Sequence, residues 1–168
     1  MRPFVILALL IGCSTSEKQN TPQVQTPPTE ASEAEEEKAK IVVLGDSISA
    51  GYGLPEDQSW PSVMGAELEK AGHPVQIINA GQSGDTSAGG LRRLSWLLKQ
   101  NPDLLILELG GNDALRGQPL ESIEENLGKT IELCKEAGVD VILAGMRIPT
   151  NYGPEYTEGF AALFPKLA

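Results

Sequence analysis

Four short apolar runs recur along the chain from residue 41 onward, and segments with a helical period separate them. The runs are β-branched or leucine-rich and nearly continuous, which is typical of strands buried on both faces. They predict four strands, at 41–44, 75–78, 104–109 and 139–144.

Helices are predicted between these runs. Residues 60–71 have Pro61 in the first turn and stop at Gly72, which suits a helix with defined ends. A second helix is predicted over 86–100, a third ends at Gly138, and a fourth runs to the end of the sequence. Their apolar stripes are Leu91, Leu94 and Leu97 or Leu98; Ile123, Leu127, Ile131 and Cys134; and Tyr156, Phe160, Leu163, Phe164 and Leu167.

The alternation of strand and helix predicts the fold class. Such a chain forms a mostly parallel sheet with helices on both faces. We therefore expect an α/β fold, a three-layer α/β/α sandwich, over residues 41–168. Cys134 lies on an apolar helix stripe, so we interpret it as a small core residue and not as a reactive thiol.

The N-terminal part has a different character. An apolar run from Phe4 to Ile11 is too short to span a bilayer, since a spanning helix needs about 20 apolar residues. Together with Gly12 and Cys13 it resembles the lipobox of bacterial lipoproteins, which implies that residues 1–13 are a signal peptide and lipobox and that Cys13 is lipidated. The alternative is a plain signal peptide followed by an unrelated cysteine.

Residues 14–40 lack aromatic side chains and are rich in Ser, Thr, Gln, Pro and Glu, so they predict an acidic, disordered tether. The lipobox implies attachment to a membrane in the bacterial cell envelope, facing the periplasm. The net charge of −10 argues against a nucleic-acid partner.

Polar loops follow the first three predicted strands. They read Gly45-Asp46-Ser47-Ile48-Ser49, then Asn79 to Thr86, then Gly110-Gly111-Asn112-Asp113. Because the carboxyl ends of parallel strands meet at one edge of a sheet, we expect these three loops to lie together.

These loops contain a nucleophile and hydrogen-bond donors. Ser47 follows a glycine where a strand turns into a helix, a place that exposes a hydroxyl. Gly84 offers a backbone N–H without a side chain, and Asn112 offers an amide. With the N–H of Ser47, they make three donors suited to one developing oxyanion.

The same segments resemble successive blocks of the SGNH (GDSL) hydrolase family, and in particular its periplasmic thioesterase, arylesterase and lysophospholipase subfamily. The blocks are Gly45-Asp46-Ser47, Ser83-Gly84-Asp85-Thr86 and Gly110-Gly111-Asn112-Asp113, supported by Ala50-Gly51-Tyr52, Glu108-Leu109, Arg147-Ile148-Pro149 and Asn151-Tyr152-Gly153. The resemblance implies that Ser47 is the nucleophile, that Gly84 and Asn112 join it in the oxyanion hole, and that no metal or organic cofactor is needed.

One block of that family is missing. Its last motif is Asp-x-x-His, whose histidine takes the proton of the serine, and nothing after Asn112 supplies it. The only histidine, His73, falls in a turn expected at the opposite edge of the sheet. We therefore expect a sequence truncated before a further strand and helix, with little or no hydrolysis by these 168 residues themselves.

Other residues near this edge are candidates for contact with substrate. They are Asp46, Asp113, Arg116, Arg147 and Tyr152. The two aspartates, like Asp85, are equally explained as structural loop residues that bond the backbone. Glu108 is a carboxylate in a leucine-rich strand, so a shifted pKa is expected there, with a structural role favoured over a catalytic one.

The leading hypothesis is a lipid-anchored serine hydrolase that cleaves small acyl esters or thioesters through an acyl-enzyme. Two alternatives stay open. One is a non-catalytic envelope lipoprotein that binds acyl chains or glycans in the same cleft, and the other is a carbohydrate deacetylase of the same fold.

Overall fold

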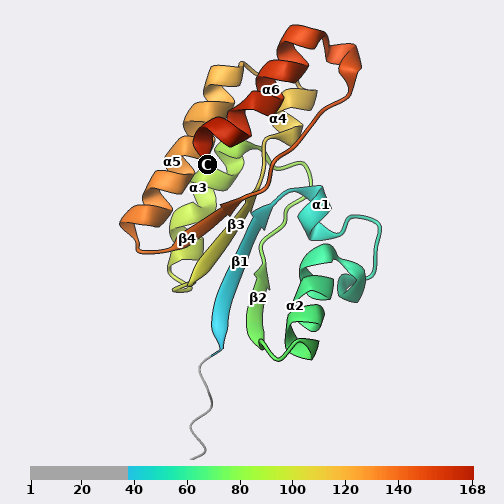
Figure 1. The fold of residues 1–168 in the computed structure, drawn as a ribbon. Coiled ribbons are helices and arrows are strands. Elements are labelled where there is room, and N and C mark those ends of the chain that lie inside the picture. Colours follow the sequence, from blue (N-terminus) through green and yellow to red (C-terminus); the bar gives the residue numbers. More distant parts are fainter. Residues whose placement is uncertain (1–37) are drawn as a thin grey trace, which may run out of the picture. The chain divides into compact units, whose positions relative to one another are not determined.

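A computed structural model describes residues 38–168 of the chain (Figure 1). The predicted lipobox at 1–13 and residues 14–37 of the predicted tether, which was placed at 14–40, lie outside the described residues. In chain order the elements are β1 (Ala39–Gly45), α1 (Ser47–Ala50), the 3-10 turn η1 (Glu56–Gln58), α2 (Trp60–Lys70), β2 (Val75–Asn79), α3 (Ser87–Leu98), β3 (Leu104–Glu108), α4 (Gly111–Leu115), α5 (Leu120–Glu136), β4 (Asp140–Leu143), the 3-10 turn η2 (Thr150–Tyr152) and α6 (Pro154–Leu167).

The four strands form one parallel sheet in the order β2-β1-β3-β4. This arrangement confirms the predicted α/β class and all four predicted strands. Its register pairs Val43 of β1 with Asn79 of β2, and Gly45 of β1 with Glu108 of β3. The carboxyl ends of these three strands therefore lie side by side, as the sequence predicts.

Successive side chains of a strand point to opposite faces of the sheet, and in β1 and β3 both sets are apolar. Val42, Leu44, Leu105 and Leu107 belong to the larger core, while Ile41, Val43 and Ile106 belong to a smaller one. This two-sided burial explains why the strands read as continuous apolar runs.

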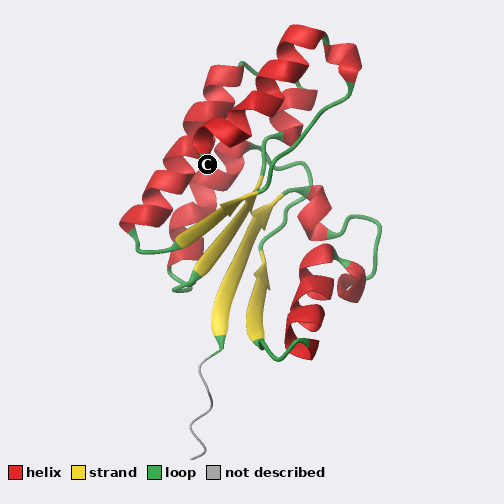
Figure 2. Ribbon diagram, in the orientation of Figure 1, coloured by secondary structure: helices red, strands yellow, loops and turns green. Residues whose placement is uncertain are grey.

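Helices cover both faces of the sheet (Figure 2). Helices α3 and α5 pack on the larger core, and α6 packs on α5 and completes that core with Phe160, Leu163 and Phe164. On the other face, Trp60, Met64 and Leu68 of α2 pack against the smaller core.

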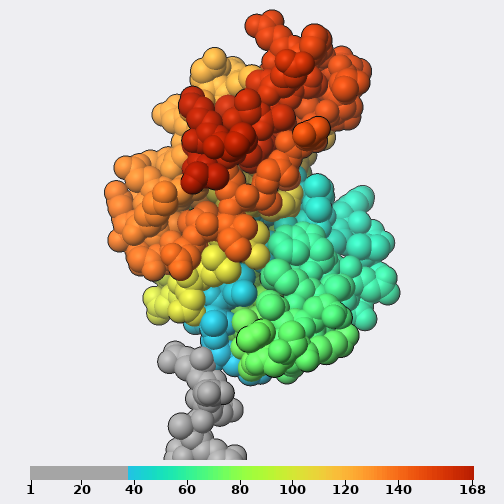
Figure 3. All heavy atoms as spheres, in the orientation of Figure 1, coloured from blue at the N-terminus to red at the C-terminus, as the bar shows by residue number. Residues whose placement is uncertain are grey.

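Helix α2 covers only part of its face. Atoms of β1, β3 and β4 remain visible between α2 and the C-terminal half of the domain (Figure 3), and Ile142 of the edge strand β4 is 52% exposed. The predicted further strand and helix beyond Ala168 concern residues outside this sequence and stay a prediction.

The first strand begins at Ala39, two residues before the predicted boundary at 41, so Ala39 and Lys40 belong to the sheet and not to the tether predicted over 14–40. Ala39 and Lys40 pair with Val75 and Gln76 of β2, and the Lys40 N–H donates to Asp103 Oδ2 at 2.7 Å. Backbone pairing of exposed residues leaves no apolar signal, so the hydrophobic pattern could not place this boundary.

Cys134 is fully buried on the inner stripe of α5, as predicted, and it is a free cysteine. Burial raises the pKa of its thiol to about 11, which keeps the thiol protonated and unreactive near neutral pH. No helix within residues 38–168 is both long and apolar enough to cross a membrane.

The contribution of the buried core to stability can be measured by replacing two β-strand residues of similar size, one buried and one exposed. Leu107 is fully buried and Ile142 is 52% exposed. We expect Leu107→Ala to lower the free energy of unfolding by about 2–5 kcal/mol, because it removes buried methyl groups and leaves a cavity. Ile142→Ala should change it by about 0.5 kcal/mol. Chemical denaturation measures both, and equal losses would contradict the described packing.

Candidate active site

Ser47 lies where β1 turns into a helix of one turn. It is the first residue of α1, and it is half-buried. The preceding Asp46 caps this helix, because its Oδ1 accepts from the backbone N–H of Ile48 at 2.9 Å. Gly51 ends the helix in the left-handed conformation, at φ 68°. The predicted turn from strand to helix at Ser47 is therefore present.

Asn112 is held directly against the loop that carries Ser47. It lies in the first turn of α4, and its Nδ2 donates to Asp46 Oδ2 at 3.0 Å. A carboxamide nitrogen carries two hydrogens, so one donor of Asn112 remains for another acceptor. Asp46 thus uses one oxygen to cap α1 and the other to fix the amide of Asn112.

The loop around Gly84 is fastened to the same two segments. Gln82 N donates to Gly45 O at 3.0 Å, and Arg116 Nη2 donates to Gly84 O at 3.0 Å. Gly84 is exposed and has φ 79°, a conformation that suits glycine. The backbone N–H groups of Ser47 and Gly84 have no hydrogen-bond acceptor within residues 38–168. Both remain free to meet a substrate oxygen.

Asp113, in the third loop, is hydrogen-bonded to the residue that follows the second loop. Its carboxylate accepts from the backbone N–H of Ser87 at 2.8 Å and from the Ser87 hydroxyl at 2.7 Å. Asn126 of α5 also donates to that hydroxyl. Asp46 and Asp113 are only 3% and 4% exposed, so their contacts are internal and support the structural role that the sequence left open for them.

Arg93 of α3 is a site residue that the sequence analysis missed. Its guanidinium donates to Asp85 Oδ2 at 2.8 Å, to Ala80 O at 2.6 Å and to Gly45 O at 3.1 Å. One side chain therefore joins the ends of two strands to the Gly84 loop. The sequence pattern carries no clear signal for the pair of Asp85 and Arg93, because Asp85 precedes the N-cap Thr86 and lies outside α3.

Glu108, the last residue of β3, contacts the turn that carries Ser47. Its Oε2 accepts from the hydroxyl of Ser49 at 2.6 Å and from Asp46 N at 3.3 Å. Burial raises the pKa of Glu108, the nearby carboxylate of Asp46 adds to the rise, and the bond from Ser49 opposes it. The pKa of Glu108 is therefore shifted as expected, and its carboxylate is hydrogen-bonded, as the favoured structural role requires.

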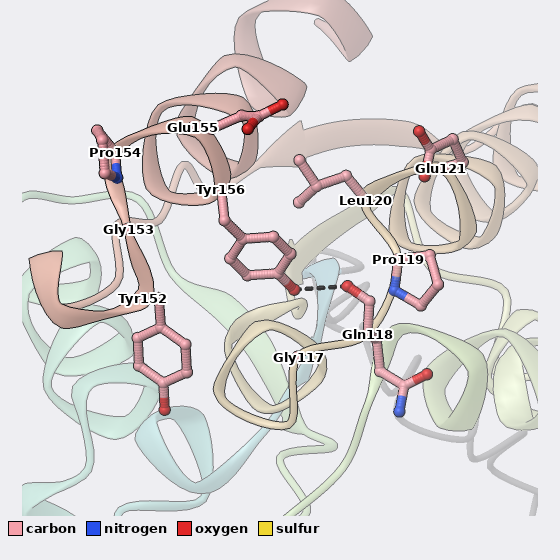
Figure 4. A pocket seen from close by; sticks show the side chains of 10 residues that line it. All are labelled: Gly117, Gln118, Pro119, Leu120, Glu121, Tyr152, Gly153, Pro154, Glu155 and Tyr156. Atoms are coloured by element: carbon pink, nitrogen blue, oxygen red, sulfur yellow. Dashed lines mark hydrogen bonds between the residues drawn. The ribbon is translucent and has the colours of Figure 1, made fainter.

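The remaining candidates lie at the rim. Arg147 is exposed in the segment after β4. Tyr152 and Tyr156 line an open hollow of about 580 Å³ beside the end of α4 (Figure 4). Tyr152 donates to Leu115 O at 3.1 Å and Tyr156 to Gln118 O at 2.5 Å, so both rings are held in place.

His73 lies far from these groups along the strands. It is exposed in the turn between α2 and β2, and β2 begins two residues later at Val75. This turn is at the amino end of the strand, whereas Ser47 follows the carboxyl end of β1. The structure therefore places His73 at the edge predicted for it, away from Ser47.

Comparison with known proteins gives a consistent picture. The GDSL-like Lipase/Acylhydrolase family model matches residues 43–168. The chain is 47% identical to the arylesterase of Vibrio mimicus over 82% of its length, and 42% identical to esterase TesA of Pseudomonas aeruginosa and to the thioesterase 1/protease 1/lysophospholipase L1 of Escherichia coli K12 over 76%. The matches span 69%, 64% and 61% of those relatives, so a third or more of two of these relatives lies outside the match.

Solved structures agree with the sequence relatives. The SGNH-hydrolase family esterase AlinE4 matches with a TM-score of 0.76 at 41% identity, covering 79% of this chain and 71% of that chain. The crystal structure of TesA matches with a TM-score of 0.75 at 42% identity, covering 77% and 72%. With three motif loops meeting at one edge of a parallel sheet, the chain belongs to the GDSL-like lipase/acylhydrolase family, the SGNH hydrolases.

Proposed function

We propose that this chain carries the acyl-transfer site of a serine hydrolase that cleaves small carboxylic esters or thioesters. The bond from Asn112 Nδ2 to Asp46 Oδ2 carries the proposal, because it places a free amide donor beside the turn of Ser47. The relatives named arylesterase, esterase and thioesterase support the same reaction class.

The proposed reaction has two acyl transfers. The Ser47 hydroxyl attacks the acyl carbon, and the carbonyl electron pair moves to oxygen. The N–H groups of Ser47 and Gly84 and the free N–H of Asn112 stabilise that oxyanion. Collapse expels the alcohol or thiol and leaves acyl-Ser47, which water then hydrolyses through the same steps.

Both steps need a group that takes the proton of the attacking hydroxyl. Asp46 and Asp113 are buried and already accept internal hydrogen bonds, and His73 lies at the other end of the strands. We propose that the base is the histidine of an Asp-x-x-His segment outside these 168 residues. These 168 residues by themselves should then hydrolyse esters weakly or not at all, since an unassisted serine hydroxyl is a poor nucleophile near neutral pH.

The rim residues are proposed to contact the substrate. Tyr152 lines the hollow beside α4, whose other end carries Asn112, so acyl groups bound there would lie near the oxyanion donors. Arg116 and Arg147 are the exposed cations proposed to meet polar or anionic parts of a substrate. In this arrangement Asp46 and Asp113 act by holding the loops.

We also propose that the protein is a lipoprotein of the bacterial cell envelope, tethered to a membrane through Cys13 and facing the periplasm. Its support is the lipobox-like end of the apolar N-terminal run. More than one acyl chain is needed for stable attachment, at about 0.8 kcal/mol per buried methylene.

The catalytic assignment is tested with the protein expressed from its complete reading frame and a nitrophenyl acyl ester. We expect Ser47→Ala to remove turnover through an acyl-enzyme. The rate that remains should be at most about 10³–10⁴-fold above the rate of the uncatalysed reaction in water. Asn112→Ala should lower kcat by about 10²–10³-fold, because it removes one oxyanion donor. Ser95→Ala, at an exposed position of α3 outside the three motif loops, is the matched control and should leave kcat unchanged.

Turnover by Ser47→Ala at the parent rate would contradict the assignment. A protein that binds acyl chains or glycans but hydrolyses no ester would support the non-catalytic alternative, and release of acetate from an acetylated sugar in preference to acyl esters would support the deacetylase.

The lipid anchor is tested by fractionating cells that express the protein with Cys13 or with Cys13→Ser. We expect the parent protein to pellet with membranes and to incorporate radiolabelled palmitate, and the variant to be soluble and unlabelled. A variant that pellets and labels like the parent would show that Cys13 is not the attachment site.

A further inference from the structure

Glu108 binds the nucleophile turn on both sides of Ser47. Asp46 N, one residue before Ser47, and Ser49 Oγ, two residues after it, donate to the same carboxylate oxygen, Oε2. The side chain is only 6% exposed, so it contacts the turn from within the protein and not from the substrate side.

The strand ends are shaped to bring α1 within reach of this carboxylate. A Cβ on Gly45 would lie 2.2 Å from Ser49 Oγ and 2.6 Å from Glu108 Oε2. A Cβ on Gly81 would lie 2.2 Å from the backbone nitrogen of Ala50. Only glycine fits at these two positions, because α1 rests directly on the backbone of β1 and of the segment after β2.

Helix α1 has only four residues, and a single turn of helix is unfavourable by itself. Its position must come from bonds to other elements. Glu108 supplies two of them, and Asn79 at the end of β2 supplies a third, since its Nδ2 donates to Ser49 O at 2.8 Å. The direction of the Ser47 hydroxyl and N–H therefore depends on side chains of β2 and β3.

The other oxygen of Glu108 argues against a role in fold stability alone. Oε1 is buried and has no hydrogen-bond partner among residues 38–168. An apolar side chain at this position would leave no buried polar atom unpaired, so the carboxylate does not serve packing alone.

We propose that Glu108 is a positioning residue, a buried carboxylate that fixes the turn of α1 and so aims the hydroxyl and backbone N–H of Ser47. It does not touch substrate and acts through Asp46 and Ser49. The kinetic part of its test rests on the proposed hydrolase function, and the structural part does not.

The kinetic test uses the protein from its complete reading frame, with rates expressed per folded molecule. We expect Glu108→Ala to lower kcat by about 10²-fold, because a displacement near 1 Å can cost that much. KM should stay within about twofold, since no substrate contact is removed. Glu108→Gln keeps an acceptor for both donors and should recover most of the lost kcat.

Leu107→Ala is the matched control for lost stability. Leu107 precedes Glu108 in β3, but its side chain belongs to the core on the opposite face. Below its unfolding temperature, this variant should keep the parent kcat. An equal loss of kcat in Leu107→Ala and Glu108→Ala, a loss expressed only in KM, or full activity of Glu108→Ala would each overturn the proposal.

Amide hydrogen exchange gives a readout that needs no activity. Glu108→Ala should speed exchange selectively at Ala50 and Gly51, whose N–H groups donate to Asp46 O and Ile48 O, and Leu107→Ala should not. Unchanged exchange at α1 in Glu108→Ala would overturn the proposal. If Ser47→Ala kept full turnover, the hydrolase function would fail, and selective exchange at α1 would still support the positioning role.

Discussion

Hydrogen bonds accepted by the carboxylates of three aspartates hold three separate loops at one edge of the sheet. Asp46 binds Asn112, Asp113 binds Ser87, and Asp85 binds Arg93. Each bond to a charged group contributes about 1.5–3 kcal/mol when both partners are present, and more is lost when one partner is removed. The loops therefore keep one arrangement, and the donors of the proposed oxyanion hole are set before substrate arrives.

The sheet makes this arrangement possible. Because all four strands are parallel, the carboxyl ends of β1, β2 and β3 lie side by side. The register pairs Gly45 of β1 with Glu108 of β3, and it pairs Asn79 of β2 with Val43, two residues before Gly45. This arrangement separates the residues at the edge into two proposed roles. Residues at the surface of this edge meet the substrate, while buried acidic residues one layer below hold them in position.

The strands, the long helices and the edge at which the motif loops meet could be predicted from the sequence. The strands and long helices show strong apolar periods, and each motif loop follows a strand, so the meeting of Ser47, Gly84 and Asn112 at one edge follows from parallel topology. The short helices α1 and α4 were less predictable, since four or five residues carry no period. Arg93 was missed because its partners, Ala80 O and Gly45 O, are backbone atoms far away in sequence.

Glu108 shows where a sequence pattern stops being informative. A carboxylate in an apolar strand indicates an unusual environment, but the pattern cannot tell which donors it meets. That depends on the glycines at 45 and 81, which let α1 approach, and thus on contacts between three elements. The same limit applies to Asp46 and Asp113, whose internal bonds appear only once the loops are placed.

Ser47 is proposed to be the residue that becomes acylated at this edge of the sheet. Treating the protein from its complete reading frame with a phosphonate ester, and locating the adduct by peptide mass spectrometry, tests this assignment. We expect one phosphonyl group, on Ser47, in the parent protein and none in a protein with Asn112 intact but Ser47 replaced by alanine. An adduct on a different residue, or no adduct in a protein that hydrolyses esters, would contradict it.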